Sequence, residues 1–143
     1  MEIRKLQNSE IAEALDLVWK VFSEFDAPDY PQQGIEEFQN FIHDETEIKK
    51  LHISGAINGG SIIGVLAMRA DHISLLFVDK YYHKQGVGKA LFQYILKQAQ
   101  GESITVNSSP YAKDFYHKLG FTDTGFEQMQ NGIRFIPMIY SLK

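Results

Sequence analysis

His83-Lys84-Gln85-Gly86-Val87-Gly88-Lys89-Ala90 joins an apolar segment with the pattern of a strand, Ile73 to Val78, directly to an amphipathic helical pattern. Two glycines at such a junction allow backbone N–H groups to face an anion at the N-terminus of the helix, where the helix dipole favours negative charge. The stretch therefore predicts a site for a phosphate-bearing ligand.

Two common phosphate-binding motifs do not fit this stretch. A P-loop needs a glycine five residues before Gly88 and a Ser or Thr after Lys89, but His83 and Ala90 occupy those positions. A dinucleotide fingerprint needs a third small residue where Leu91 stands, and it usually lies in the first βα turn. Neither nucleotide-binding class is indicated.

The composition indicates one domain. The chain has 143 residues, of which 44% are hydrophobic, enough for a single substantial core. It has no cysteine, which excludes disulfides and cysteine-ligated metals. We find neither a signal-peptide pattern nor an apolar run of the roughly 20 residues that span a bilayer, so we expect a cytoplasmic protein without membrane contact.

The charge is distributed unevenly along the chain. Residues 1–47 hold twelve acidic and three basic side chains, whereas residues 48–143 hold six acidic and eleven basic ones. The segment Lys80 to Lys97 contains four lysines and no acid. An anionic ligand suits this second region and a cationic one the first, unless the asymmetry is only that of a solvated surface. The basic segment is short and lacks arginine, so nucleic-acid binding is not expected.

The hydrophobic pattern outside the glycine stretch predicts an α/β fold with the order β-α-α-β-β-β-α-β-α-β-β. Strands are expected at Glu2–Leu6, Leu51–Ile57, Ser61–Met68, His72–Val78, Ser103–Asn107, Thr122–Gln130 and Ile133–Leu142. Helices are expected at Ile11–Phe25, Gly34–Asp44, Val87–Ile95 and Pro110–Leu119, which gives about seven strands and four helices.

Turn and cap residues support these boundaries. Asn58-Gly59 and Asn131-Gly132 each lie between two strand patterns, where both residues tolerate the positive φ of a type I′ turn. Ser109 is the expected N-cap of the last helix, with Pro110 at its first position. Gly120 stands just past the expected end of that helix.

Gly86 and Gly88, with the strand that precedes them, resemble the acyl-CoA loop of the GCN5-related N-acetyltransferase (GNAT) superfamily, whose pattern is Arg or Gln, two residues, Gly, any residue, then Gly or Ala. His83 occupies the Arg/Gln position and departs from the pattern. The segment Asn107 to Phe121 resembles the strand, helix and "FYxKxGF" segment of the same superfamily at the expected distance. The resemblance implies a mixed central sheet in which strands 4 and 5 splay apart, over one domain of residues 1–143.

The resemblance also implies an activity, transfer of an acetyl group from acetyl-CoA to a primary amine by direct attack in a ternary complex. A non-catalytic acyl-CoA-binding module of the same fold is the alternative, and a general phosphate-ligand binding protein is a third. No metal is expected, since His43, His52 and His117 lack ligand spacing. The acidic first third predicts a cationic acceptor such as a polyamine, an aminoglycoside or a lysine-containing peptide, and a homodimer is possible because dimers are common in such families.

The resemblance assigns the donor site to the glycine loop and the two splayed strands. Backbone N–H groups from Gln85 to Lys89 would hold the pyrophosphate, with charge from Lys84 and Lys89, and Asn107 would bond the pantetheine arm unless it only ends its strand. The predicted acetyl-CoA-binding residues are Leu76, Phe77, Val78, His83, Lys84, Gln85, Gly86, Val87, Gly88, Lys89, Asn107 and Tyr116.

Three side chains are predicted to be catalytic. Tyr116 matches the superfamily tyrosine that protonates the leaving thiolate, and the N–H of Val78 or a neighbour would stabilise the carbonyl oxygen. His72 is the candidate base, since its ordinary pKa near 6.5 suits proton removal, and strand alternation is expected to place it on one face with Ser74 and Leu76. Glu24, with Asp26 beside it, is the rival base. Core packing for Tyr116 and a structural role for His72 remain the alternatives.

Overall fold

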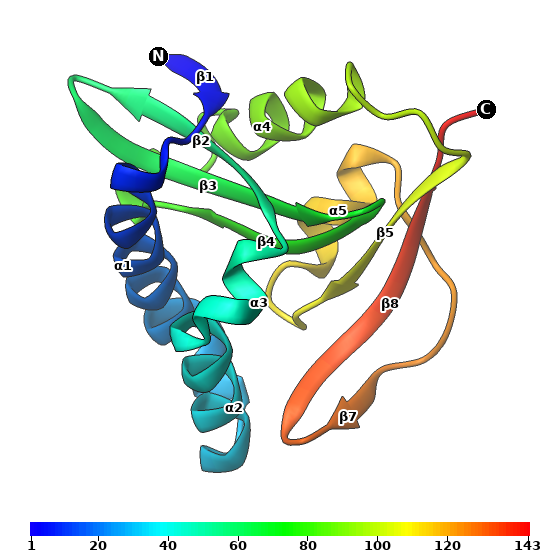
Figure 1. Ribbon diagram of the computed structural model, residues 1–143. Coiled ribbons are helices and arrows are strands. Elements are labelled where there is room, and N and C mark those ends of the chain that lie inside the picture. The colour runs from blue at the N-terminus through cyan, green and yellow to red at the C-terminus, as the bar shows by residue number, and fades with distance from the viewer.

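A mixed eight-stranded sheet runs through the computed structural model, which describes residues 1–143 (Figure 1). The strand order is β1-β2-β3-β4-β5-β8-β6, and β7 pairs with β8. The strands are β1 (Glu2–Lys5), β2 (His52–Asn58), β3 (Ser61–Arg69), β4 (His72–Val78), β5 (Ser103–Ser108), β6 (Thr122–Asp123), β7 (Gln128–Gln130) and β8 (Ile133–Ser141). Only β4 and β5 pair in parallel, and every other pairing is antiparallel.

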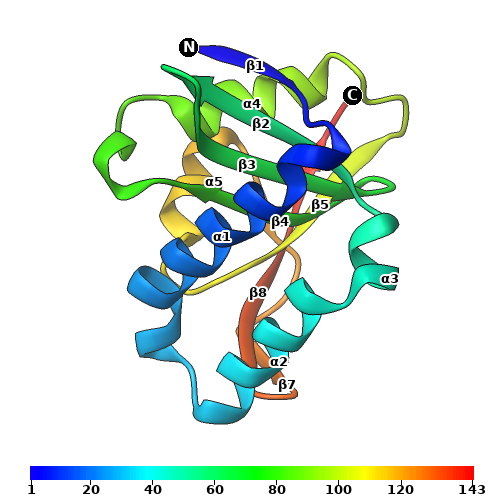
Figure 2. The same cartoon turned by 60° about the vertical axis from the view of Figure 1, so that its left-hand side comes forward.

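The helices divide between the two faces of the sheet (Figures 1 and 2). They are α1 (Ile11–Val21), α2 (Gln32–His43), α3 (Glu45–Lys49), α4 (Val87–Leu96) and α5 (Lys113–Leu119). One apolar core joins the sheet to α1, α2 and α3 through residues such as Val18, Ile42 and Ile48. A second core joins the other face to α4 and α5 through residues such as Leu91 and Tyr116. We refer to these faces as the α1 side and the α4 side. None of these helices has the length and apolar character to cross a membrane.

A β-bulge at Ser74 changes the expected alternation in β4. The register with β3 pairs Ala67 with Leu75 and Met68 with Ile73, so Ser74 has no partner. The extra residue shifts the alternation of side chains by one position, so residues before and after the bulge exchange faces of the sheet. Ile73 and Leu76 therefore both lie in the core of the α4 side, whereas Leu75 lies in that of the α1 side. The prediction that His72 shares a face with Leu76 was wrong, since the bulge places His72 opposite, on the α1 side.

Strands β4 and β5 separate soon after they meet. They pair only at His72 with Thr105 and at Ile73 with Val106. Beyond these pairs β4 continues to Val78 along one side of a gap and β5 to Ser108 along the other (Figure 1). The predicted splay of strands 4 and 5 is confirmed, and with it the α/β fold class.

Most predicted boundaries agree with the structure, and the differences have local causes. The turn after β2 consists of Gly59 and Gly60, both at positive φ, because Asn58 still pairs with Ser61. Helix α5 begins at Lys113 rather than Pro110, although the Ser109 hydroxyl does accept from the Ala112 N–H at 3.2 Å. The strand expected at 122–130 is broken into β6 and β7, and the short helix α3, capped by Asp44, was not predicted. The Asn131-Gly132 turn and the position of Gly120 just past the end of the last helix are confirmed, and Gly120 is left-handed.

Candidate active site

A cleft of about 1350 Å³ passes through the sheet where β4 and β5 separate. On the α4 side its walls include Val87 and Gly88 of the glycine loop and Tyr116 of α5. On the α1 side they include Phe38 of α2 and Phe77 of β4. The cleft therefore joins two chambers across one sheet, with the edge of β4 between them.

The glycine loop forms the α4-side chamber as the sequence predicts. Gly86 has a φ of 84°, a left-handed conformation that a side chain disfavours, and α4 begins at the next residue. The first N–H groups of α4, at Val87, Gly88 and Lys89, have no acceptor within the helix. They point with the positive end of the helix dipole toward the loop. The first side-chain carbon of any other residue at Gly88 would come within 2.8 Å of the Phe115 ring, so such a residue would force the ring of α5 to shift.

Two further features give the loop an anion-binding character. Lys84 has a φ of 62°, which is uncommon for any residue but glycine, and it turns the chain into Gly86. Lys84 and Lys89 are both exposed and both line the cleft. Gln85, by contrast, does not line it, because its side chain donates to the Tyr81 carbonyl at 2.9 Å.

The edge of β4 that faces the gap carries free backbone groups. The Asp79 N–H donates to the Ile63 carbonyl of β3 at 2.8 Å, so Phe77 also directs its amide toward β3. Leu76 and Val78, one residue out of phase, direct their N–H groups into the gap. An extended ligand can pair with this edge as an added strand would. Asn107 of β5 lines the opposite wall, one residue beyond the last β4–β5 pair.

His83 caps this edge in a way that the sequence did not reveal. Its Nε2 lies 2.7 Å from the Val78 carbonyl oxygen, which accepts a hydrogen bond when that nitrogen is protonated. Its ring packs against Phe25 with centroids 4.8 Å apart. An Arg or Gln at this position would lack the ring contact with Phe25. The histidine that departs from the family pattern therefore packs against Phe25, as the pattern's own residues would not.

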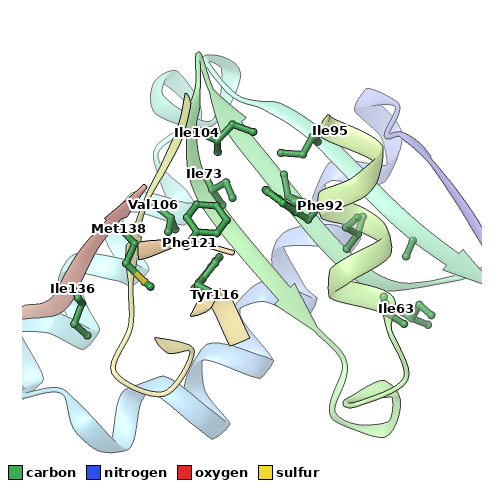
Figure 3. Packing of buried hydrophobic residues seen from close by; sticks show 14 residues of the cluster. Ile63, Ile73, Phe92, Ile95, Ile104, Val106, Tyr116, Phe121, Ile136 and Met138 are labelled. Carbon is green, nitrogen blue, oxygen red and sulfur yellow. The ribbon is translucent and has the colours of Figure 1, made fainter. Parts of the chain in front are cut away.

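Tyr116 stands at the inner end of the gap. It is 5% exposed and lies in the α4-side core beside Phe121 (Figure 3). No protein group forms a hydrogen bond with its hydroxyl. Since no fully buried polar side-chain atom of the protein lacks a hydrogen-bond partner, this hydroxyl must be accessible, and it opens to the cleft. Burial raises the pKa of the Tyr116 phenol well above its ordinary value, and the negative charge of Asp26 raises it further. Tyr116 therefore remains protonated and able to donate.

Asp26 faces the cleft from the end of a π-helical turn, Phe22–Asp26, that continues α1. Wider turns of this kind occur often at functional sites, and a short 3-10 helix that contains Pro28, Ala27–Asp29, follows this one. Asp26 is only 8% exposed. Burial raises the pKa of its carboxyl to about 6, although the hydrogen bond from Ser109 opposes the rise. Asp26 therefore takes up a proton near neutral pH more readily than an ordinary carboxylate.

His72 lines the α1-side chamber at its narrow end, where β4 and β5 still pair. Its Nδ1 lies 2.8 Å from the Thr105 hydroxyl. Burial without an acidic partner lowers the pKa of its imidazole, which keeps the ring neutral and able to accept a proton.

Glu24 does not belong to the cleft. It forms an ion pair with Lys80, with the Lys80 Nζ 3.2 Å from the Glu24 carboxylate, on the surface of the molecule. The π-helical turn directs Asp26, two residues further on, inward instead. Of the two carboxylates, sequence reasoning therefore put first the one that lies outside the cleft, since a regular helix of period 3.6 does not show which residue a π turn presents to the cleft.

The structure thus brings eleven of the twelve predicted acetyl-CoA ligands and two of the three predicted catalytic residues to one cleft, leaving Gln85 and Glu24 outside. Sequence reasoning missed Ser109, Tyr111 and the rings of α2. Together the groups can hold an anion at α4, bind an extended chain along β4, donate a proton from Tyr116 and accept one at Asp26 or His72.

One curated relative matches part of the chain. The chain is 33% identical over 70 residues to the peptidyl-lysine N-acetyltransferase YjaB of Salmonella typhimurium, an alignment that covers 48% of each protein. The chain thus matches about half the length of this relative.

Solved structures match along the whole chain. The GCN5-related N-acetyltransferase structure from Rhodopseudomonas palustris has a TM-score of 0.85 at 22% identity and covers 99% of this chain and 95% of its own. An aminoglycoside 6′-N-acetyltransferase complexed with coenzyme A has a TM-score of 0.70 at 14% identity, covering 100% and 98%. The model of the acetyltransferase (GNAT) domain family matches residues 26–142. The chain therefore belongs to the GNAT acetyltransferase family.

Proposed function

We propose that this protein is an N-acetyltransferase that transfers the acetyl group of acetyl-CoA to a primary amine by direct attack in a ternary complex. The observation that carries the proposal is the cleft through the sheet, which joins an anion-binding helix terminus to a buried proton donor along one free strand edge. Residues 1–143 act as one catalytic domain. A cytoplasmic location and a homodimer remain predictions.

Residues of the α4-side chamber fit coenzyme A. The N–H groups of Val87, Gly88 and Lys89 at the start of α4 suit a pyrophosphate, and Lys84 adds charge. The Leu76 and Val78 amides and Asn107 suit the two amide groups of a pantetheine arm. When bound, coenzyme A supplies the acetyl thioester. The role of Gln85 is then its backbone N–H alone.

Groups around the gap can stabilise the transfer. The N–H of Leu76 or Val78 donates to the carbonyl oxygen as negative charge develops there. Tyr116 donates a proton to the departing sulfur. The raised pKa of its phenol keeps the hydroxyl protonated until that step. The chamber on the α1 side then holds the amine, whose proton must be removed before attack because its ordinary pKa is near 10. His72 and Asp26 are the two titratable groups placed to receive it.

Thiol release from acetyl-CoA on addition of amines tests the proposal. We expect an amine-dependent rate, with intersecting initial-velocity patterns that indicate a ternary complex. Tyr116→Phe should lower kcat about 100-fold and leave the affinity for acetyl-CoA unchanged. Acetyl-CoA binding without thiol release from any amine would instead identify a non-catalytic acyl-CoA-binding module.

A further inference from the structure

The α1-side chamber is lined mainly by aromatic rings. We call Phe22, Tyr30, Phe38, Phe41 and Phe77 the aromatic wall, and all five line the cleft. Phe22 stacks on Phe38 with centroids 4.0 Å apart and meets Tyr30 edge-on at 5.5 Å. Phe38 in turn contacts Phe77 of β4 at 5.8 Å. A surface of stacked rings is suited to an apolar or aromatic body, and ring faces also attract a cation.

Asp26 supplies the carboxylate of this chamber. The other carboxylate that lines the cleft, Asp114, belongs to α5 on the α4 side, where its neighbour Phe115 packs against the glycine loop. The lysines that line the cleft, Lys84, Lys89 and Lys118, belong to the α4 and α5 segments as well. The α1-side chamber can therefore neutralise one positive charge, and a second one buried there would lack a partner.

Next to Tyr30 and Ile133, which line the cleft, contacts join the segment before α2 to the β7–β8 hairpin and limit what can enter. The Tyr30 hydroxyl donates to the Arg134 carbonyl at 3.1 Å, and Arg134 Nη1 donates to the Asp29 carbonyl at 2.9 Å. At Gly34 the start of α2 lies so close to Gly132 of the β7–β8 hairpin that a side chain would overlap the Gly132 carbonyl. Figure 2 shows α2 beside this hairpin. These links favour a small molecule over a residue on the surface of a folded protein.

We propose that the acceptor is a small primary amine that carries one ammonium group on an apolar body, with the ammonium group held by Asp26 and the body against the aromatic wall. This inference rests on the proposed function. It narrows the expected acceptor class, because polyamines and aminoglycosides bring several charges for which the chamber has one partner.

The proton balance follows from these positions. The ammonium group passes one proton to the Asp26 carboxylate, and the freed lone pair forms the C–N bond as the C–S bond breaks. Tyr116 protonates the sulfur and regains a proton from the nitrogen of the new amide. Asp26 then releases its proton to water, so one amide, one thiol and one proton leave the site. Burial of Asp26, which raises the pKa of its carboxyl, favours this role.

The test compares acceptors that differ in charge and size. We expect kcat/KM for 2-phenylethylamine to exceed that for spermidine, for kanamycin and for an N-terminally blocked lysine peptide by about 10-fold or more. Discrimination of at least this size results when a buried polar or charged group is left without a partner. Preference for spermidine, kanamycin or the peptide would overturn the inference while leaving acetyl transfer intact. Failure of every amine to release thiol would overturn the proposed function itself.

Two variants separate recognition by Asp26 from folding. Asp26→Asn should lower kcat/KM for 2-phenylethylamine about 100-fold, with acetyl-CoA still stabilising the variant against heat. Asp29→Asn, an exposed neighbour outside the cleft lining, is the matched control and should stay close to the wild type. Equal kcat/KM values for Asp26→Asn and Asp29→Asn would contradict the assignment.

Discussion

Replacement of Asp26 by Asn should stabilise the free protein at neutral pH while impairing its activity. Burial raises the pKa of this carboxyl from 3.8 to about 6. Each pKa unit corresponds to about 1.4 kcal/mol, so ionised Asp26 lowers the free energy of unfolding at neutral pH by up to about 3 kcal/mol. A neutral side chain of the same shape avoids this cost, and Ser109 remains available to bond its amide.

The sign of the pH dependence follows from the raised pKa. The native state holds the Asp26 proton more tightly than the unfolded chain does. Stability is therefore undiminished below about pH 4, falls as the pH rises through about 6, and levels off near pH 7. Tyr30 and Tyr116, which face Asp26, have pKa values raised by burial and remain protonated throughout. Asp29 in the same loop and Arg134 opposite are common to both proteins.

Urea unfolding of the wild type and Asp26→Asn across this pH range measures the effect. The two proteins should be similar at about pH 4, and Asp26→Asn should gain stability steadily up to about pH 7, with an unchanged m-value. Near neutral pH this corresponds to a rise in Tm of several degrees, roughly 6–10 °C. Parallel pH profiles for the two proteins would refute the view that Asp26 is a buried, strained carboxylate.

Other substitutions test the remaining parts of the site. Gly86→Ala should cost about 1–2 kcal/mol of stability, seen in thermal unfolding, and weaken acetyl-CoA binding in calorimetry, because its left-handed φ disfavours a side chain. His83→Ala should raise KM for acetyl-CoA about fivefold through loss of the bond to Val78, while His83→Asn retains part of the affinity. Glu24→Gln should leave kcat/KM within about twofold, since an exposed ion pair with Lys80 is worth little; a large loss would return Glu24 to the mechanism.

The donor half of the site could be predicted from the sequence because its chemistry is local. Gly86 and Gly88 are adjacent to the strand and the helix that they connect. The backbone groups suited to the anion therefore all come from one short continuous segment of the sequence. Tyr116 was found in the same way, from its own segment. The His83 contact with Phe25 was not foreseen, because it joins residues 58 positions apart whose only link is tertiary packing.

The acceptor half could not be predicted because it is assembled from distant segments and from backbone irregularities. The bulge at Ser74 places His72 on the opposite face of the sheet from the one expected, and no residue type in the sequence predicts that bulge. The π turn that aims Asp26 rather than Glu24 into the cleft interrupts a regular helical period. The rings of the aromatic wall come from the π-helical turn, the segment before α2, α2 itself and β4, where each resembles an ordinary core residue, and only the gap between β4 and β5 leaves them facing a cavity.

A crystal structure with coenzyme A tests the central claim most directly. We predict the pyrophosphate on the N-terminus of α4 at Val87 to Lys89, the arm between β4 and β5, and the thiol within hydrogen-bond reach of the Tyr116 hydroxyl. The α1-side chamber should stay open beside it for the amine. A pyrophosphate bound away from α4, or an arm that leaves the gap between β4 and β5 empty, would contradict the account.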